Sequence, residues 1–417
     1  MSHSVNFMCA ADLHLGRQVG LASEQSYVIK AWENLIDATL AHTPPIDALL
    51  LAGDVIDGDD LFIEMYGVLK KGIKRLLERG IQVIAIAGNH DPEVLRQIRD
   101  SLELPGFHLL GTKGRWERLS TSFRGQTIHI DGISFRSPFF ETNPLEIYDL
   151  EKVAQGEVLI GLLHCDVDVS ESRYAPVRTI DFQRMDHSAW FLGHIHIPKA
   201  IGKNIHYCGS LQGLDVSETG AHGALLLSIQ SNGKIEIQQK PLAPLRFEKM
   251  VVDFSDLSLD GFGPFFEKIE AELKEKMKGE EGFLDKIGLR LILRGRTPLF
   301  REIRKSLFKL QEQEGNGVSL NGKWIPYFIE SIQNETRPTY DLKRLGEGND
   351  FVAALARQLL LFDQNEPFEH MEKVFQRDAV FKQVEESWLT KEECASLYLS
   401  KGYELLDELL RQKQENL

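Results

Sequence analysis

Short apolar runs alternate with amphipathic stretches through the first part of the chain. Three runs end at a glycine or a polar residue and predict buried strands: Asn6–Ala11, Ala48–Ala52 and Gln82–Ala87. The stretches between them have helical spacing and predict helices: Ser26–Thr39, Leu61–Arg79 and one from Glu93, with Pro92 in its first turn. This alternation of strand and helix is typical of a layered α/β domain.

The pattern changes after Gly125, where shorter apolar runs are separated by glycine and polar turns. These runs predict further strands: Thr127–Ile130, Ile133–Ser137, Val158–His164, Ala189–Leu192, Ala200–Tyr207 and Ala224–Ile229. A second sheet that faces the first is the simplest packing. Residues 1–240 therefore predict a β-sandwich flanked by helices.

Two further regions follow a boundary near residues 241–250. Residues 247–340 predict a small α/β domain with these elements: strand Phe247–Phe254, helix Phe262–Met277, strand Gly288–Leu293 and strand Tyr327–Gln333. A break at Arg337–Pro338 precedes residues 341–417, which predict only helices from Phe351 onward.

Charge and composition narrow the class of protein without locating a binding face. The 417 residues carry a net charge of -14, so long-range attraction alone does not bring this chain to nucleic acid. No apolar run approaches the roughly 18 residues of a membrane span, and the N-terminus lacks the pattern of a signal peptide. We therefore expect a cytoplasmic protein whose four cysteines are reduced core residues.

Five short polar motifs lie in order along residues 1–240. They are Asp12-Leu-His14, Gly53-Asp54-Val-Ile-Asp57-Gly58, Gly88-Asn89-His90-Asp91, His164 and Gly193-His194-Ile-His196. The first three each follow an apolar strand directly, and ligands gather at the carboxyl ends of strands in α/β domains. We expect seven side chains from these motifs to converge on one place: Asp12, His14, Asp54, Asn89, His164, His194 and His196.

The residue types in this set suit two divalent cations. Carboxylate and amide oxygens mixed with imidazoles favour a transition metal over Ca²⁺, and the absence of a thiolate disfavours structural zinc. Mn²⁺ is the expected metal, with Fe, Co, Zn and Mg as alternatives. Two cations about 4 Å apart would bind phosphate oxygens, supply a hydroxide nucleophile and neutralise charge during an in-line displacement. Asp54 is the expected bridging carboxylate.

His90 and Asp57 are the expected catalytic residues. His90 follows the ligand Asn89 and is free to donate a proton to the phosphoryl or leaving-group oxygen. Asp57 lies three residues after Asp54 and is expected to orient His90. The remaining histidines belong to no motif and are expected to be structural: His3, His42, His108, His129, His187, His206, His222 and His370.

The motifs DLH, GDVIDG, GNHD, His164 and GHIH resemble those of the calcineurin-like metallophosphoesterase superfamily. The segment YCGSLQGLDVSETGAHG is similar to one in the DNA double-strand-break repair exonucleases, the SbcD-like nuclease subunits, and the plan of the chain is most similar to their bacterial YhaO-type members. Two residues depart from the branch. Asp57 stands where archaeal and eukaryotic relatives carry a histidine, and Cys208 replaces the usual proline.

The resemblance implies a Mn²⁺-dependent nuclease. Asp12, His14, Asp54 and His196 would hold one cation, and a second set would hold the other: Asp54, Asn89, His164 and His194. Residues 247–340 would form a capping domain that guides DNA. Residues 341–417 would bind an SMC-like ATPase with a long coiled coil, and the nuclease is expected to form a homodimer.

A basic stretch, Lys286–Lys309, provides independent support for contact with DNA, because arginine and lysine along a helix neutralise phosphates. The expected contacts are Arg294, Arg296, Arg301, Arg304 and Lys305; the alternative is a solvated helix face. The stretch Glu385–Leu410 has an apolar stripe with partly helical spacing. It predicts either packing on its own domain or a groove for the partner's coiled coil.

Two other functional classes remain open on the sequence. One is a different phosphoesterase of the superfamily: a protein phosphatase, a cyclic-nucleotide phosphodiesterase or a nucleotide pyrophosphohydrolase. Protein phosphatases of this type place arginine and glutamate where this chain has Gly58 and Asp91. The other class is a non-catalytic scaffold that binds DNA or a partner, against which the complete ligand set counts.

Overall fold

The computed structural model describes residues 4–19, 26–57, 62–102, 104–169, 171–255, 263–278, 282–305, 318–321, 325–364 and 391–415. The chain divides into two compact units. The first runs through Glu248 and includes Met277–Gly288 and Ile325–Tyr327. The second contains the remaining residues from Lys249 to the C-terminus.

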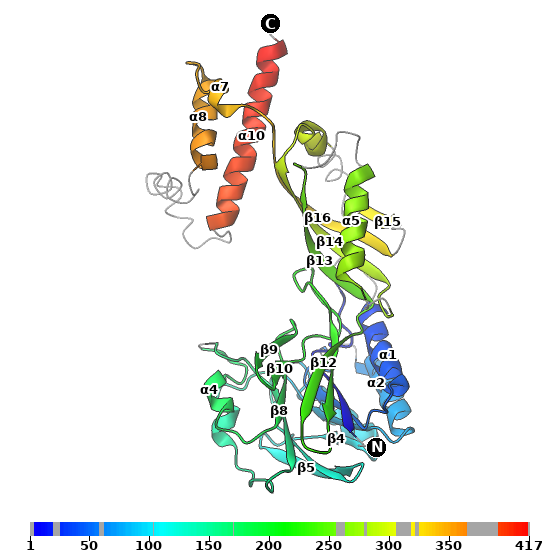
Figure 1. Cartoon of the computed structure of the whole chain (residues 1–417). Coiled ribbons are helices and arrows are strands. Elements are labelled where there is room, and N and C mark those ends of the chain that lie inside the picture. Colours follow the sequence, from blue (N-terminus) through cyan, green and yellow to red (C-terminus); the bar gives the residue numbers. More distant parts are fainter. Residues whose placement is uncertain are drawn as a thin grey trace. The chain divides into compact units, whose positions relative to one another are not determined.

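Two six-stranded sheets form the first unit (Figure 1). The first sheet has the order β12-β11-β1-β2-β3-β4, in which β1, β2, β3 and β4 run parallel. Its strands are β1 (Val5–Ala10), β2 (Ala48–Ala52), β3 (Gln82–Ile86), β4 (Phe107–Leu109), β11 (Gly223–Ile229) and β12 (Ile235–Pro241).

The second sheet has the order β5-β6-β7-β8-β10-β9, and β6, β7, β8 and β10 are its parallel strands. Its strands are β5 (Glu117–Phe123), β6 (Gln126–Gly132), β7 (Val158–His164), β8 (Ala189–Gly193), β9 (Lys199–Gly202) and β10 (Ile205–Tyr207). The prediction of one strand over Ala200–Tyr207 is wrong. Lys203 and Asn204 form a turn there, and Asn204 donates to the carbonyl of Ser188, so the segment folds into the β9–β10 hairpin.

The main core lies between the two sheets. Apolar side chains of β1 and β2, such as Phe7 and Leu50, form one buried cluster with Ile130 and Ile160 of the second sheet. The helices α1 (Ser26–Ala41), α2 (Phe62–Leu77) and α3 (Val94–Leu102) cover the outer face of the first sheet (Figure 1). Every residue of β1 and β2 is therefore buried, as continuous apolar runs predict for strands covered on both faces. The predicted α/β sandwich is confirmed.

The remaining elements of the first unit are short. They are a 3₁₀ turn at Pro144–Ile147 and α4 (Thr179–Phe182). The cysteines Cys9, Cys165 and Cys208 are buried and free of disulfides, as expected; the side chain of Cys394 lies outside the described residues.

A four-stranded sheet with the order β13-β14-β16-β15 and several helices make up most of the second unit. The elements are β13 (Leu245–Asp253), α5 (Gly263–Lys276), β14 (Lys286–Arg296), β15 (Val318–Asn321), β16 (Pro326–Arg337), α7 (Leu342–Leu345), α8 (Phe351–Gln364) and α10 (Lys391–Glu415). Buried residues of α8 and α10, among them Leu359, Tyr403 and Leu406, pack together with Phe300. Within the described parts of the chain, no helix is long and apolar enough to cross a membrane.

The strand predicted at Gly288–Leu293 is confirmed, so only a later part of the basic stretch Lys286–Lys309 is helical. Its first half is strand β14, because Ile287, Leu289 and Leu291 are buried in the sheet. A helical segment follows over residues 300–305, and residues 306–309 lie outside the described chain. In the C-terminal stretch Glu385–Leu410, Trp388 and Leu389 also lie outside it.

Candidate metal centre

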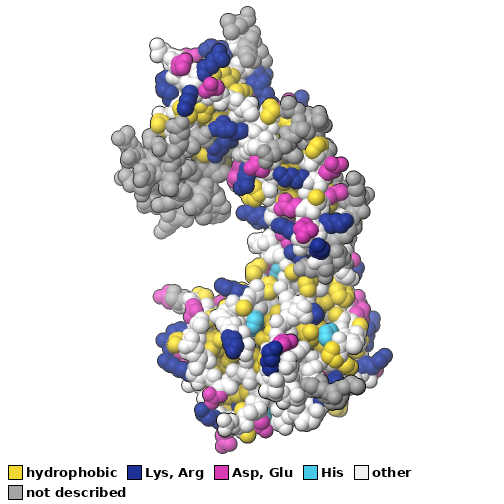
Figure 2. All heavy atoms as spheres, in the orientation of Figure 1, with side chains coloured by type: hydrophobic (Ala, Val, Ile, Leu, Met, Phe, Trp, Pro, Cys, Tyr) yellow, Lys and Arg dark blue, Asp and Glu magenta, His cyan; other side chains and the backbone are white. Residues whose placement is uncertain are grey.

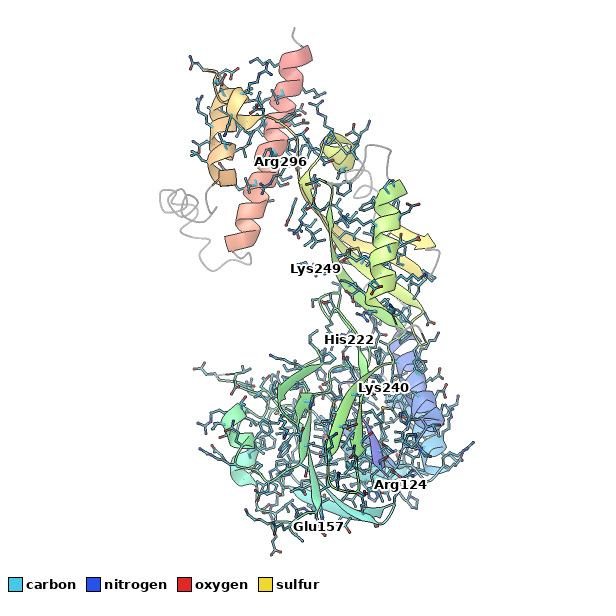
Figure 3. The ribbon with its side chains drawn as sticks, in the orientation of Figure 1. Arg124, Glu157, His222, Lys240, Lys249 and Arg296 are labelled. Atoms are coloured by element: carbon cyan, nitrogen blue, oxygen red, sulfur yellow. The ribbon has the colours of Figure 1, made fainter. Side chains whose placement is uncertain are left out.

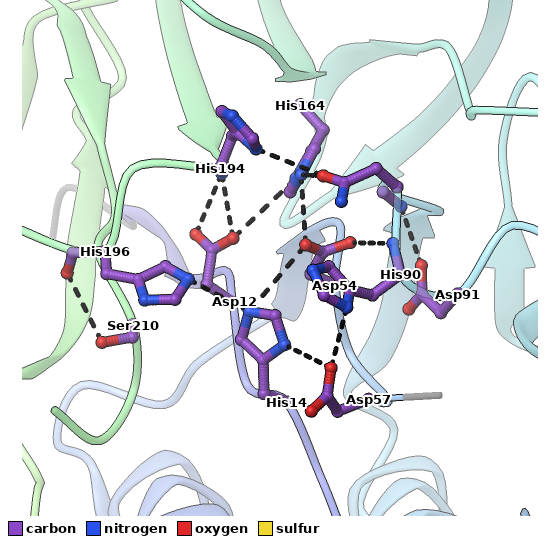
Figure 4. A network of polar contacts seen from close by, with 12 residues as sticks. Asp12, His14, Asp54, Asp57, His90, Asp91, His164, His194, His196 and Ser210 are labelled. Carbon is purple, nitrogen blue, oxygen red and sulfur yellow. Dashed lines mark hydrogen bonds and ion pairs between the residues drawn. The ribbon is translucent and has the colours of Figure 1, made fainter. Parts of the chain in front are cut away.

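The predicted ligands lie at the carboxyl ends of five strands, in loops that meet at one end of the sandwich (Figure 4). Asp12 and His14 follow β1, Asp54 follows β2, and Asn89 follows β3. His164 ends β7, and the last two ligands, His194 and His196, follow β8. All seven predicted side chains are thus brought together, because the strands in each sheet run parallel where the loops leave them.

Several of these side chains depend on unusual backbone conformations. Asp12, His14, Asp54 and His194 all have positive φ, between 44° and 95°, which costs on the order of 1–3 kcal/mol per residue. Hydrogen bonds between the loops hold them there. The amide of His14 donates to the carbonyl of Asp54 at 3.0 Å, and the amide of His194 donates to the Asp12 carboxylate at 2.9 Å. Strain of this kind concentrates at functional sites.

Two motif glycines are required by close approach. A Cβ on Gly88 would lie 2.1 Å from Asp54 Oδ1, and a Cβ on Gly193 would lie 2.2 Å from the carbonyl oxygen of Ala52. Any larger residue would therefore displace a candidate ligand or its supporting strand.

His14 and His196 face one another at the first candidate position. Their Nε2 atoms are 3.1 Å apart, and His14 Nε2 lies 3.8 Å from Asp54 Oδ2. On the far side of each ring, Nδ1 lies beside a carboxylate: Asp57 at 3.3 Å from His14 and Glu218 at 2.7 Å from His196. A carboxylate accepts a hydrogen bond from Nδ1–H, which leaves the two Nε2 lone pairs directed at each other.

The second candidate position has the same character. His164 Nδ1 lies 3.1 Å from the carbonyl oxygen of Ala52 and donates to it, so Nε2 is the nitrogen of His164 left for a cation. That Nε2 lies 2.9 Å from Asn89 Oδ1 and 3.3 Å from Asp54 Oδ2. His194 Nδ1 lies 3.2 Å from the same Asn89 oxygen.

Lone pairs that face one another in a buried pocket repel unless a cation lies between them. The side chains of Asp12, His14 and His164 are fully buried, and that of Asp54 is almost so. Two groups of possible ligands overlap here: Asp12, His14 and His196, and Asp12, Asp54 and His164. Donors of this kind suit divalent transition metals, so the residues fit the two cations that the sequence predicts.

The electrostatics of the pocket agree with this reading. Burial lowers the pKa of His164, but the nearby carboxylates of Asp54 and Asp12 outweigh burial and raise it to about 9. Burial raises the pKa of Asp54, but His164 outweighs burial and holds that pKa well below its usual range. Burial and the charge of His164 lower the pKa of His194 to about 4. The carboxylates therefore favour positive charge at His164, whereas the imidazole of His194 is kept neutral.

His90 is the exposed member of the site. Its side chain is 41% exposed, and its Nδ1 lies 2.8 Å from Asp57 Oδ1. The hydrogen bond to Asp57 raises the pKa of His90. The structure thus pairs His90 with Asp57, and leaves His90 accessible to a substrate.

Three acidic residues at the site were not predicted as functional. Glu218 contacts His196, as described above, and Asp166 Oδ1 lies 3.4 Å from His194 Nε2. Asp91 is buried and accepts hydrogen bonds from the amides of Gly88, Val55 and Ile56, so it ties two ligand loops together. Burial and the charge of Asp54 raise the pKa of Asp91 to about 7.

His222, expected to be structural, is linked to the candidate ligand His196 through Ser210 and Glu218. Its Nδ1 is 2.9 Å from Ser210 Oγ, and Ser210 Oγ donates to Glu218 at 3.2 Å. Figure 3 shows His222 near one end of the first unit and Arg124 and Glu157 near the other.

The predicted DNA contacts lie in the second unit, and most have partners within it. Arg294 lies 3.4 Å from Asp253. Arg301 donates to Asp407 at 2.8 Å, and Arg304 lies 4.0 Å from the same carboxylate. Arg296 donates to the Tyr403 hydroxyl at 3.4 Å. Basic and acidic side chains are interspersed on the face of this unit that Figure 2 shows.

Residues 5–198 match the family model described as calcineurin-like phosphoesterase. These residues, with their parallel-stranded sandwich and clustered polar side chains, are similar to a domain of that family. The match covers slightly less than half of the chain.

Three known proteins are similar to parts of this chain. The chain is 26% identical over 336 residues to the uncharacterized metallophosphoesterase YhaO of Bacillus subtilis. This alignment covers 75% of this chain and 79% of YhaO. It is 25% identical over 260 residues to the DNA double-strand break repair protein Mre11 of Methanopyrus kandleri, over 55% of each chain. A solved dimetal phosphatase from Danio rerio covers 56% of this chain and 98% of its own, with 11% identity and a TM-score of 0.35.

Proposed function

We propose that this protein is a two-metal phosphodiesterase that hydrolyses DNA, depends on Mn²⁺ and acts in DNA repair as an exonuclease or endonuclease. The observation that carries the proposal is the convergence of seven donor side chains beside one exposed histidine. DNA is the favoured substrate because Mre11 proteins, which are named for double-strand break repair, are among the relatives. The match to YhaO also extends well beyond residues 5–198.

Asp12, His14, Asp54 and His196 would hold one cation in this proposal. Asp54 would bridge to the other, with three further ligands: Asn89, His164 and His194. When bound, the two cations would neutralise phosphate oxygens and lower the pKa of the attacking water. Mn²⁺ is proposed because the ligands combine carboxylate, amide and imidazole donors, which several transition metals accept.

His90 and Asp57 would act on the phosphodiester itself. The Asp57 carboxylate accepts from His90 Nδ1–H and so fixes the ring with Nε2 available to the substrate. When protonated, Nε2 would donate to the phosphoryl or leaving-group oxygen as charge develops there. Asp57 also lies beside His14. Through Asp57, the position of His90 therefore depends on that of His14, a proposed ligand of the first cation.

A Mn²⁺ nuclease assay on His90→Gln tests this role. We expect kcat on a DNA oligonucleotide to fall by about 10²-fold or more, while the bound metal is retained. His42→Gln is the matched control, because His42 lies in the loop before β2 and contacts only a local carbonyl in the described chain. Unchanged turnover in His90→Gln, or equal losses in both variants, would remove His90 from the mechanism.

A comparison of substrates tests the choice of DNA. Plasmid, oligonucleotide, nitrophenyl phosphodiester and phosphopeptide would be offered to the wild-type protein with Mn²⁺, Fe, Co, Zn and Mg in turn. We expect the DNA substrates to be cleaved. Hydrolysis of the phosphopeptide or of the small diester alone would indicate another phosphoesterase of the family, and no hydrolysis would indicate a scaffold.

We also propose that the C-terminal helices bind an SMC-like coiled-coil ATPase. Much of the apolar stripe of α10 packs on α8, but Leu397, Tyr398 and Leu405 remain 41–50% exposed. These three side chains are the candidates for contact with a partner helix. Leu405→Glu should abolish co-purification of the ATPase and leave hydrolysis of a small phosphodiester unchanged; a complex that survives would refute this docking site.

The expected homodimer is tested by the mass of the purified protein in solution.

A further inference from the structure

A row of neighbouring aromatic rings, ending in an arginine, leads outward from the metal pocket. The Tyr174 ring lies 4.8 Å from the ring of His194, tilted by 36°. The Phe139 ring lies 6.0 Å from that of Tyr174, tilted by 39°. The guanidinium of Arg173 lies 3.7 Å over the Phe139 ring. The outer end of this row is open, since Phe139 is 42% exposed and the Arg173 side chain is 57% exposed.

Two segments hold this row in place. Phe140 and Tyr174 form a parallel bridge, with the Phe140 amide donating to the carbonyl of Arg173 at 2.9 Å. The Phe140 ring packs inward against Phe135, at 5.6 Å. Successive residues of an extended segment point to opposite sides, so Phe139 is directed outward, in agreement with its exposure.

The same segment is tied to the metal ligands. Ser172 Oγ donates to Asp166, the Tyr174 amide donates to Ser172 Oγ at 2.9 Å, and Asp166 lies beside His194. On the outer side, Glu141 lies 3.1 Å from Arg173 Nε and steadies the guanidinium. The exposed ring and cation are thus positioned relative to the metal pocket.

The phenyl group of Phe139 leaves much of its surface in water, where a ligand can reach it. Aromatic rings and guanidinium planes are the groups on which unpaired nucleobases stack, and the arginine charge also attracts phosphate. Continuity with the pocket through Tyr174 and Phe139 would hold such a base further along the strand from the phosphate under attack.

We infer that Arg173, Phe139 and Tyr174 form a stacking platform for an unpaired nucleobase of the DNA strand being cut. The inference rests on the proposed function and deepens it, because it names the substrate as a single-stranded or frayed DNA end. A base inside a duplex is stacked on its neighbours and does not present a free face to the platform.

Fluorescence of 2-aminopurine tests the platform separately from hydrolysis. A single-stranded oligonucleotide with one 2-aminopurine is bound to the Mn²⁺-loaded protein, and cleavage is followed on gels from the same samples. We expect binding to quench the fluorescence in the wild type. Phe139→Leu, which keeps an apolar side chain but removes the ring, should lose the quenching and bind about tenfold more weakly. Phe139→Trp should keep the quenching.

Phe351→Leu is the matched control, since Phe351 is a 65% exposed phenylalanine on α8 in the second unit, and it should behave as the wild type. Quenching that is absent in the wild type, or that persists in Phe139→Leu, would overturn the platform. The gels report the nuclease proposal independently. Quenching without cleavage refutes nuclease activity and supports the platform, whereas cleavage with equal quenching in all variants refutes the platform alone.

Discussion

Replacing Glu218 by glutamine should weaken one of the two metal positions and spare the other. Glu218 Oε1 lies 2.7 Å from His196 Nδ1. Its Oε2 accepts from the Leu214 amide at 2.8 Å and from Ser210 Oγ at 3.2 Å. One carboxylate thus satisfies three donors, and a glutamine of the same shape has only one oxygen to offer them.

Either orientation of the new amide is unfavourable. If its NH₂ faces His196 Nδ1, the imidazole proton must move to Nε2, which then has no lone pair for a cation. If its NH₂ faces the Leu214 amide, two donors meet and one partly buried group loses its partner, at a cost of about 1–3 kcal/mol. Losing a partner of this kind lowers metal affinity about 10- to 100-fold, equivalent to roughly 1.4–2.7 kcal/mol.

Calorimetric titration of Mn²⁺ into protein stripped by a chelator would measure both positions. We expect the affinity of one position to fall by that factor and the other to change less than twofold, because His196 belongs to one proposed ligand set only. Glu236→Gln is the matched control, since Glu236 is an exposed glutamate on β12 paired with Lys234.

Unchanged affinity at both positions would refute the tautomer argument. Equal losses at both positions with an unaltered thermal unfolding curve would show that Glu218 does not act through His196 alone. Glu218→Asp should recover little, because the shorter side chain withdraws the carboxylate from the imidazole.

Three further predictions concern stability. Asp131 is fully buried and accepts from Arg118 at 2.6 Å and from His187 at 3.2 Å, so Asp131→Asn should destabilise the fold by about 3–5 kcal/mol in urea denaturation at pH 7. Burial raises the pKa of Asp131, but these partners outweigh it and lower the pKa; the stabilisation is therefore present above the ordinary carboxyl pKa near 4 and is lost as pH falls below it. Asp407→Asn should destabilise the second unit and leave phosphodiester hydrolysis unchanged, because Asp407 pairs with Arg301 of the same unit. Removal of Mn²⁺ by a chelator should lower the melting temperature of the first unit, since each site held at 100 times its Kd adds about 2.7 kcal/mol, and an unshifted melting curve would contradict tight binding.

Local sequence patterns were sufficient to predict the buried strands and the ligands that directly follow them. The apolar runs before Asp12, Asp54 and Asn89 identify parallel strands, and a ligand that follows each run must lie at the same sheet edge. Pairing between distant segments is not encoded in this way. Strand β10 lies between β8 and β9, which the apolar pattern of Ala200–Tyr207 does not reveal.

The same limit applies to side chains. Glu218 lies 22 positions after His196, beyond the β9–β10 hairpin, and no periodicity connects the two. The arginines of the basic stretch were predicted as DNA contacts from their charge density. Their acidic partners are distant in sequence, so no local pattern reveals the ion pairs. Arg301 and Asp407 are 106 residues apart.

The central claim is that seven side chains cage two cations around one shared carboxylate, Asp54. Elemental analysis of Mn²⁺ per chain after dialysis tests it most directly, with Asp54→Asn beside the wild type and circular dichroism as a check on folding. The account predicts two bound cations in the wild type and loss of both in the folded variant. Fewer than two in the wild type, or two retained by Asp54→Asn, would contradict it.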